Sequence, residues 1–182
     1  MKKVQSKINR PKSQIKTDKY VLNFLGDIKV KEPIDMVKLR SHIQNSLEFR
    51  EYNEQTKENE NNIRWKRTAS QIIQDGYVYR GKDCSDLSVV FLALCRALGI
   101  SGCLIKLATL SNDNTHSIIA VELDTQWYRL DISMTNSVPL KGQLPDNQKL
   151  KKNGWKVWKV GRDLWDLGLD DMEKEKIIYN QR

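Results

Sequence analysis

The chain has 182 residues, of which 39% are hydrophobic and 30% charged, and this fits one folded domain with a sizeable core. No apolar run is long enough to cross a membrane, and no apolar stretch follows the basic N-terminus, so we expect a cytoplasmic protein without a secretory signal. The net charge of +8 comes from the flanks, because residues 81–135 hold four basic and six acidic side chains. These flanks could contact nucleic acid or an acidic partner, but we favour a solvated surface.

The three cysteines, Cys84, Cys95 and Cys103, are an odd number and show no metal-binding spacing. We therefore expect free thiols in a reducing compartment, and neither a metal nor a cofactor. Cys95 and Cys103 lie in apolar stretches and read as buried packing residues. The sequence leaves the oligomeric state open.

The N-terminal third alternates between polar and apolar segments. Residues 1–19 are polar and basic, and we expect a flexible arm followed by a single domain over residues 20–182. The apolar run 20–26 ends at a glycine and could be a strand or a helix. Asp35 can cap a helix, whose apolar face would be Met36, Leu39, Ile43 and Leu47. Residues 51–62 hold one apolar side chain and predict a loop.

Two helices are predicted next. The run Thr68-Ala69-Ser70-Gln71 matches a capping box, and Gly76 can end the short helix that it begins. The second helix ends at Gly99, with Asp83 as its natural N-cap, and this places Cys84 in its first turn. Its apolar side chains recur at helical spacing: Leu87, Val90, Phe91, Leu94, Cys95 and Leu98.

Beyond this helix the pattern changes to strands, at 103–108, 117–121 and 127–131. A further strand is expected at 155–160, and a last helix over 170–179. A helix followed by antiparallel strands is an α+β order.

Three residues suggest a nucleophilic site. A thiolate is stabilised in the first turn of a helix, where Cys84 is expected, although Asp83 and Asp86 would oppose its ionisation. His116 lies at the start of a predicted strand and Asp131 at the end of the next, so the carboxylate can reach the imidazole. We therefore expect Cys84 as nucleophile, His116 as its base and Asp131 as the residue that orients the histidine.

Several sequence pieces resemble the transglutaminase-like superfamily, including its bacterial cysteine-protease branch. They fall within residues 65–133, and they are Trp65 with the helix at 68–76, Gly81-Lys82-Asp83-Cys84-Ser85-Asp86-Leu87, Leu94-Cys95-Arg96-Ala97-Leu98-Gly99-Ile100, His116-Ser117-Ile118-Ile119-Ala120-Val121 and Trp127-Tyr128-Arg129-Leu130-Asp131. The chain departs from the family pattern at three positions. Lys82 interrupts Gly-Asp, Ser85 replaces an acid, and Ser117 replaces alanine.

The resemblance implies a papain-like α+β core, with the nucleophile at the start of a helix packed on an antiparallel sheet. It also implies acyl transfer through a thioester on a protein or peptide substrate. The backbone N–H of Cys84 would be one oxyanion donor, and Trp65, Gln71 and Tyr79 are candidates for substrate binding or a second donor. An amide hydrolase is the leading hypothesis. The alternatives are a protein–glutamine acyltransferase with the same triad, and an inactive binding module on the same fold.

Overall fold

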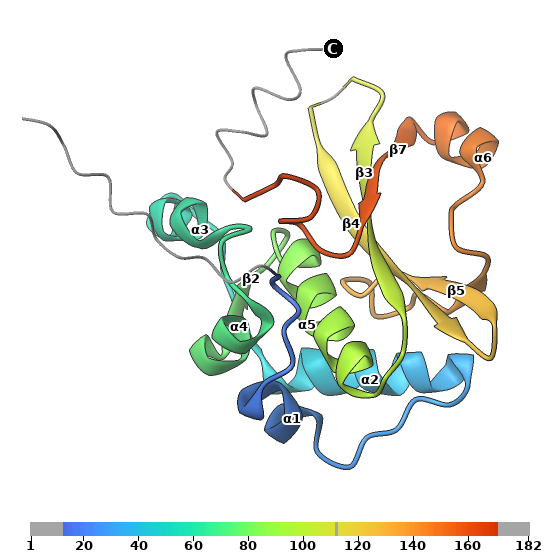
Figure 1. The fold of residues 1–182 in the computed structure, drawn as a ribbon. Coiled ribbons are helices and arrows are strands. Elements are labelled where there is room, and N and C mark those ends of the chain that lie inside the picture. Colours follow the sequence, from blue (N-terminus) through green and yellow to red (C-terminus); the bar gives the residue numbers. More distant parts are fainter. Residues whose placement is uncertain (1–12, 112, 171–182) are drawn as a thin grey trace, which may run out of the picture.

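The computed structural model describes residues 13–111 and 113–170, and it is an α+β fold with most of its helices against one face of an antiparallel sheet and one short helix against the other (Figure 1). The first half of the chain comprises α1 (Lys19–Leu25), α2 (Pro33–Ser46), β1 (Glu48–Arg50), α3 (Lys57–Ile63), α4 (Ala69–Asp75), β2 (Tyr77–Tyr79) and α5 (Cys84–Ala97). The second half comprises β3 (Gly102–Thr109), β4 (Thr115–Leu123), β5 (Gln126–Leu130), β6 (Leu140–Lys141), α6 (Asn147–Lys152) and β7 (Trp155–Gly161). The predicted fold class is thereby confirmed.

The main sheet has five strands in the order β6-β5-β4-β3-β7, and all neighbouring pairs are antiparallel. A two-residue turn joins β4 to β5, with positive φ angles of 46° at Asp124 and 65° at Thr125. That backbone conformation matches the twist of a tight hairpin. In the β3–β4 ladder Lys106 lies opposite Ser117, and Leu107 opposite His116.

Helix α5 forms the centre of the core, because its side chains are buried from Ser85 to Cys95. It lies between the sheet and helices α1, α2 and α4, and it contacts these helices together with β3 and β4 (Figure 1). The opposite face of the sheet carries a second apolar cluster, in which Ile105 and Leu107 pack with Leu150 of α6. Successive residues of β3 therefore face α5 and α6 in turn, as the two-residue period of a strand requires.

The cap signals of the sequence were accurate at α4 but not at α2. Helix α2 begins at Pro33 with Glu32 as its N-cap, and Asp35 is its third residue, which completes a capping box. Thr68 and Gln71 form the reciprocal capping box of α4, and Gly76 ends this helix with a φ of 74°. The apolar run 20–26, whose type was open, contains helix α1, which Asp18 caps. The expected loop at 51–62 is wrong in part, because α3 occupies its second half.

Helix α3 lacks an apolar stripe. Its buried residue is Glu60, which pairs with Arg64 one turn later, and its Asn59 amide donates to the Tyr79 hydroxyl at 2.7 Å. The expected last helix, at 170–179, falls almost entirely on residues 171–182, which lie outside the described part of the chain.

Residues 13–18, which the sequence assigns to a basic arm, pack against the core. The side chain of Gln14 is 1% exposed, and its Nε2 donates to the carbonyl oxygens of Trp65 and Arg67, each at 2.9 Å. Its Oε1 accepts from the backbone N–H of Leu164 at 3.1 Å. Ile15 is buried beside it. This segment therefore ties the start of the domain to the turn that leads into α4 and to the segment after β7.

Replacing Gln14 with alanine should lower the free energy of unfolding by about 2–3 kcal/mol, because buried backbone groups lose their partners. Urea unfolding followed by tryptophan fluorescence measures the change. Gln55→Ala is the matched control, because Gln55 is exposed and its side chain should contribute little. An unchanged midpoint for Gln14→Ala would mean that the hydrogen bonds of the Gln14 side chain add nothing to the stability of the domain.

Candidate active site

Cys84 is the first residue of α5, as the sequence predicts. The apolar side chains of this helix are fixed in the core, so its N-terminus has a defined position beside the sheet. Asp83 occupies the N-cap position but makes no side-chain cap hydrogen bond, which differs from the expected cap. The Cys84 thiol is half-buried, whereas Cys95 and Cys103 are buried, and all three cysteines are free.

His116 and Asp131 are joined by a short contact between strand ends. His116 is the second residue of β4 and Asp131 follows β5, and their Nε2 and Oδ2 atoms are 2.6 Å apart. The other oxygen of Asp131, Oδ1, accepts from the backbone N–H of Ser133 at 3.0 Å and from its hydroxyl at 2.8 Å. Both carboxylate oxygens are therefore held, and the imidazole has a fixed orientation.

The thiol and the imidazole shift each other's ionisation. Burial would raise the pKa of Cys84, but a hydrogen bond to His116 and the positive charges of Lys106 and His116 lower it to about 7. Burial would lower the pKa of His116, but its hydrogen bonds to Asp131 and Cys84 raise it to about 10. A thiolate–imidazolium pair is thus favoured between these two values. Burial also raises the pKa of Cys95 and that of Cys103, so those thiols stay protonated.

Two hollows meet at Cys84. The larger, of about 540 Å³, also contains His116 and Asp131, and its apolar wall is formed by Leu107, Met134, Leu150 and Trp155. The smaller, of about 50 Å³, contains Trp65, Ser85 and Lys106. Cys84 therefore lines one hollow together with His116 and the other together with Lys106, and the two hollows also share Gly81, Asn114 and Thr115.

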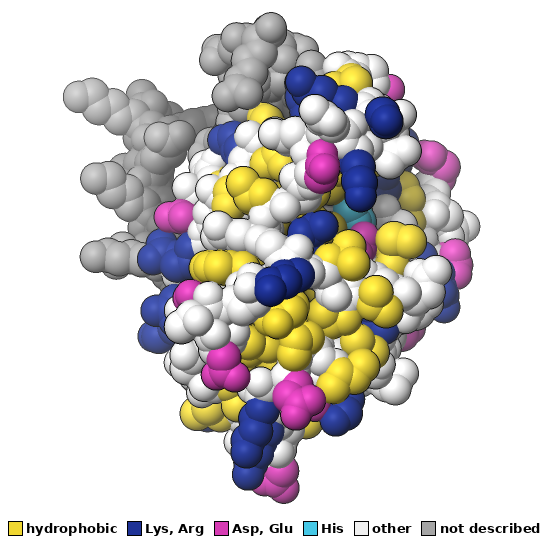
Figure 2. All heavy atoms as spheres, turned by 90° about the vertical axis from the view of Figure 1, so that its right-hand side faces the viewer, with side chains coloured by type: hydrophobic (Ala, Val, Ile, Leu, Met, Phe, Trp, Pro, Cys, Tyr) yellow, Lys and Arg dark blue, Asp and Glu magenta, His cyan; other side chains and the backbone are white. Residues whose placement is uncertain are grey.

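A third hollow, of about 530 Å³, continues the larger one, because both share Gly81, Asp83 and Ser133. Figure 2 shows the face that bears β5 and α6. A histidine side chain (cyan) is visible within a recess, and apolar side chains (yellow) gather below it. Exposed large apolar residues in the segment around β6 are Met134, Val138, Leu140 and Leu144.

The three residues expected to bind substrate or stabilise an oxyanion lie in different places. Trp65 lines the smaller hollow with Cys84, but its Nε1 donates to the Ser85 hydroxyl at 3.1 Å. Gln71 accepts from the backbone N–H of Thr68 at 2.8 Å and so caps α4. The Tyr79 hydroxyl accepts from Asn59 at 2.7 Å. Gln71 and Tyr79 line none of the three hollows described here, so only Trp65 is near the thiol.

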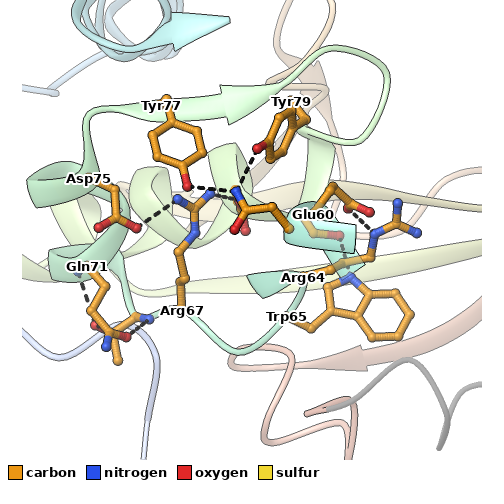
Figure 3. Close-up of polar contacts among 12 residues, drawn as sticks. Glu60, Arg64, Trp65, Arg67, Gln71, Asp75, Tyr77 and Tyr79 are labelled. Carbon is orange, nitrogen blue, oxygen red and sulfur yellow. Dashed lines mark hydrogen bonds and ion pairs between the residues drawn. The ribbon is translucent and has the colours of Figure 1, made fainter. Parts of the chain in front are cut away.

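The sequence analysis did not predict the ion pairs of Arg67, which join it to Asp75 (Figure 3) and to Asp86 in the first turn of α5. Arg67 is 5% exposed, and its guanidinium donates to Asp86 and, at 3.0 Å, to Asp75. Its carbon Cζ lies 5.1 Å from the centre of the Tyr77 ring. Asp86 is two residues from Cys84, and the sequence suggested that its charge would oppose a thiolate. Arg67 compensates that charge.

A second missed residue is Arg40 of α2, which is 3% exposed. Its guanidinium donates to the carbonyl oxygens of Met134, Thr135 and Ser137, at 3.0, 2.6 and 2.5 Å respectively. These carbonyls belong to the segment that follows Asp131, so α2 holds the segment that positions the carboxylate. In the sequence, Arg40 stands beside the apolar stripe of a predicted helix, which could have indicated a buried arginine. Its partners are visible only in the folded structure.

The third missed residue is Lys106, which the sequence places inside an apolar strand. It is 1% exposed, and its Nζ lies within hydrogen-bond distance of the hydroxyls of Ser85 and Ser117. The sequence signal for this residue was a lysine within an apolar strand, at a position that faces α5 and should be apolar.

Residues 13–111 and 113–170 contain no group of three or more His, Cys, Asp or Glu side chains that could hold a metal ion. Within the same residues, none of the helices has the length and apolar character needed to cross a membrane.

No protein-family model matches the sequence, and no curated protein matches it. Among solved structures, a candidate cysteine protease from Cytophaga hutchinsonii is similar at 19% identity with a TM-score of 0.42, over 85% of this chain and 51% of that chain. LapG from Legionella pneumophila is similar at 19% identity with a TM-score of 0.44, over 64% of this chain and 63% of that chain. EGTA-treated LapG gives 20% identity and the same TM-score, and 61% of that chain is covered. The present chain thus spans between half and two thirds of the length of these proteins.

Proposed function

We propose that the protein is a transglutaminase-like cysteine hydrolase of amide bonds, with Cys84 as nucleophile, His116 as acid and base, and Asp131 as the orienting carboxylate. The observation that carries this proposal is the convergence of the three residues on one hollow, with the histidine held by the aspartate at 2.6 Å. The order of α5, β3, β4 and β5 along the chain and the sequence pieces at 65–133 give further support.

The reaction follows from the thiolate–imidazolium pair. The Cys84 sulfur attacks the carbonyl carbon of an amide, and the backbone N–H of Cys84 helps to hold the resulting oxyanion. His116 donates its proton to the amine nitrogen as the carbon–nitrogen bond breaks, which leaves a thioester. Neutral His116 then takes a proton from water as the water oxygen attacks the thioester. The carbon–sulfur bond breaks, the carboxylic acid is released, and the thiolate–imidazolium pair is restored.

A peptide or protein chain is the substrate class that we propose. The hollows of about 530 and 540 Å³ adjoin on either side of Ser133, which suits an extended chain that passes the sulfur. The apolar wall contributed by Leu107, Leu150 and Trp155 suits a large apolar side chain next to the scissile bond.

Selective alkylation of Cys84 tests the proposal without a known substrate. Iodoacetamide should modify Cys84 much faster than Cys95 or Cys103, because the thiolate is the reacting form and the other thiols are buried and protonated. The rate should rise with pH through a midpoint near the Cys84 pKa of about 7, since deprotonation creates the nucleophile. Mass spectrometry of tryptic peptides after short exposures measures each site.

The outcome that contradicts the proposal is equal labelling of the three cysteines in the folded protein, or a midpoint for Cys84 at the value of an ordinary thiol. In an amine-containing buffer, recovery of an amide product instead of an acid would favour the acyltransferase alternative. Failure of Cys84 to form any acyl-enzyme with an activated ester would favour an inactive binding module.

A further inference from the structure

Lys106 occupies a position where an apolar side chain is expected. Along β3, Leu104 packs in the cluster around α5, whereas Ile105 and Leu107 pack in the cluster on the opposite face. Lys106 shares the α5 side with Leu104 and is 1% exposed. Burying an ammonium group is costly unless its surroundings compensate the charge, so its environment indicates what it does.

The environment of the Lys106 ammonium is a set of acceptors. Its Nζ lies 3.2 Å from the Ser85 hydroxyl oxygen, 3.1 Å from the Ser117 hydroxyl oxygen and 4.8 Å from the centre of the Trp65 ring. An ammonium group donates hydrogen bonds and accepts none, and an aromatic face attracts a cation. Two hydroxyls and a tryptophan ring therefore suit the charged form of the lysine.

The donors and lone pairs of the Ser85 hydroxyl determine the directions of the hydrogen bonds in this cluster. The Ser85 oxygen accepts from Trp65 Nε1 and from Lys106 Nζ, which uses both of its lone pairs. Its own hydrogen is therefore donated to the Ser117 oxygen, 2.9 Å away. The Ser85 hydroxyl also lies 4.0 Å from the Cys84 sulfur. The cluster thus fixes the ammonium group beside the first turn of α5.

Ser85 and Ser117 are two of the three positions at which the chain departs from the pattern of the family that it resembles. Both contact Lys106. An acid at position 85 would place a negative charge beside the ammonium, whereas the serine is a neutral partner. Lys106 and Cys84 both line the smaller hollow.

We propose that Lys106 is a positioning residue that acts through Cys84, with its buried ammonium stabilising the thiolate from the smaller hollow, which both residues line. This inference rests on the proposed function, since it assigns Lys106 a role in forming the nucleophile. The charge of Lys106 is one of the causes that lower the pKa of the Cys84 thiol. In this arrangement Lys106 and His116 both contribute positive charge near the sulfur, and the thiolate does not depend on the histidine alone.

The test is the pH dependence of Cys84 alkylation by iodoacetamide in the full chain. In Lys106→Met the side chain keeps its length and loses its charge, and the midpoint should rise by about 1–3 pH units. The labelling rate at pH 7 should fall accordingly. Lys29→Met is the matched control, because it removes the same charge from an exposed position and should leave the midpoint unchanged.

Lys106→Gln separates charge from folding, because it retains an N–H donor for the two serines. The variant that counts is one that melts at the wild-type temperature. If the pH midpoint of Cys84 alkylation is raised in that variant, the inference is supported. If the midpoint equals that of the wild type, the inference is overturned. The wild-type protein distinguishes this failure from failure of the proposed function. If its Cys84 titrates as an ordinary thiol, the nucleophile assignment fails first. If its midpoint is low and both Lys106 variants match it, only the role of Lys106 is refuted.

Discussion

Replacing Asp131 with asparagine is expected to slow acylation of Cys84 by about three to four orders of magnitude at neutral pH. The amide keeps the shape of the carboxylate, but it cannot stabilise the imidazolium, and it can select the wrong tautomer of His116. The thiolate loses its partner as a result. The measurement is the pre-steady-state release of nitrophenolate from p-nitrophenyl acetate, with thermal melting as a check that the fold is intact.

Two further variants calibrate this result. Cys84→Ala should abolish the nitrophenolate burst with little change in melting temperature, because a half-buried thiol contributes little packing. Asp27→Asn removes a carboxylate from an exposed turn and should leave the burst unchanged. If Asp131→Asn unfolds the chain while Cys84→Ala retains the burst, Asp131 is a structural residue and the triad assignment is wrong.

Replacing Arg67 with methionine should destabilise the fold by about 3–5 kcal/mol, because Asp86 would remain buried without its partner. The loss is a large fraction of the total stability of a domain of this size. Urea unfolding followed by tryptophan fluorescence gives the free energy. A transition at the wild-type urea concentration would show that Asp86 finds another compensating group.

Arg50→Met is the matched control for Arg67→Met. The Arg50 guanidinium stacks on the same ring, 3.7 Å from the centre of Tyr77, but its ion pair with Glu48 is exposed, so its loss should cost less than about 1 kcal/mol. The double variant Arg67→Met with Asp86→Leu should recover most of the lost stability, because it removes the uncompensated charge together with its partner.

Local sequence signals predicted the elements that carry the site. The capping box at Thr68, the apolar spacing of α5 and the strands around His116 and Asp131 each depend on neighbours within a few residues. The structure brings together Cys84, His116 and Asp131, as the helix-then-strands order suggested. Of the three residues expected to assist them, Trp65 alone is near the sulfur.

The parts that the sequence did not predict depend on contacts between distant residues. Gln14 bonds to the backbone of Leu164, and Arg40 bonds to carbonyl groups 94–97 positions further along the chain. Polar residues with such partners read as surface residues in the sequence, because burial and pairing appear only in the fold. Helix α3 was missed for the same reason, since its Asn59 amide donates to the Tyr79 hydroxyl 20 positions away. The buried residue of α3 is the charged Glu60, so an apolar stripe does not mark its buried face.

The segment that carries Asp131 is anchored to two side chains of α2 instead of to a neighbouring strand. It leaves the sheet after β5, and the Arg40 guanidinium holds three of its carbonyl oxygens, while the Gln44 amide donates to the Ile132 carbonyl at 2.7 Å. Such a segment can open locally as a cooperative unit while the sheet and α5 remain intact. The free energy of that local opening, and not the global free energy of unfolding, therefore sets the fraction of molecules in which His116 has its carboxylate. A variant of α2 can consequently melt at the wild-type temperature and still spend much of its time with an unassembled site.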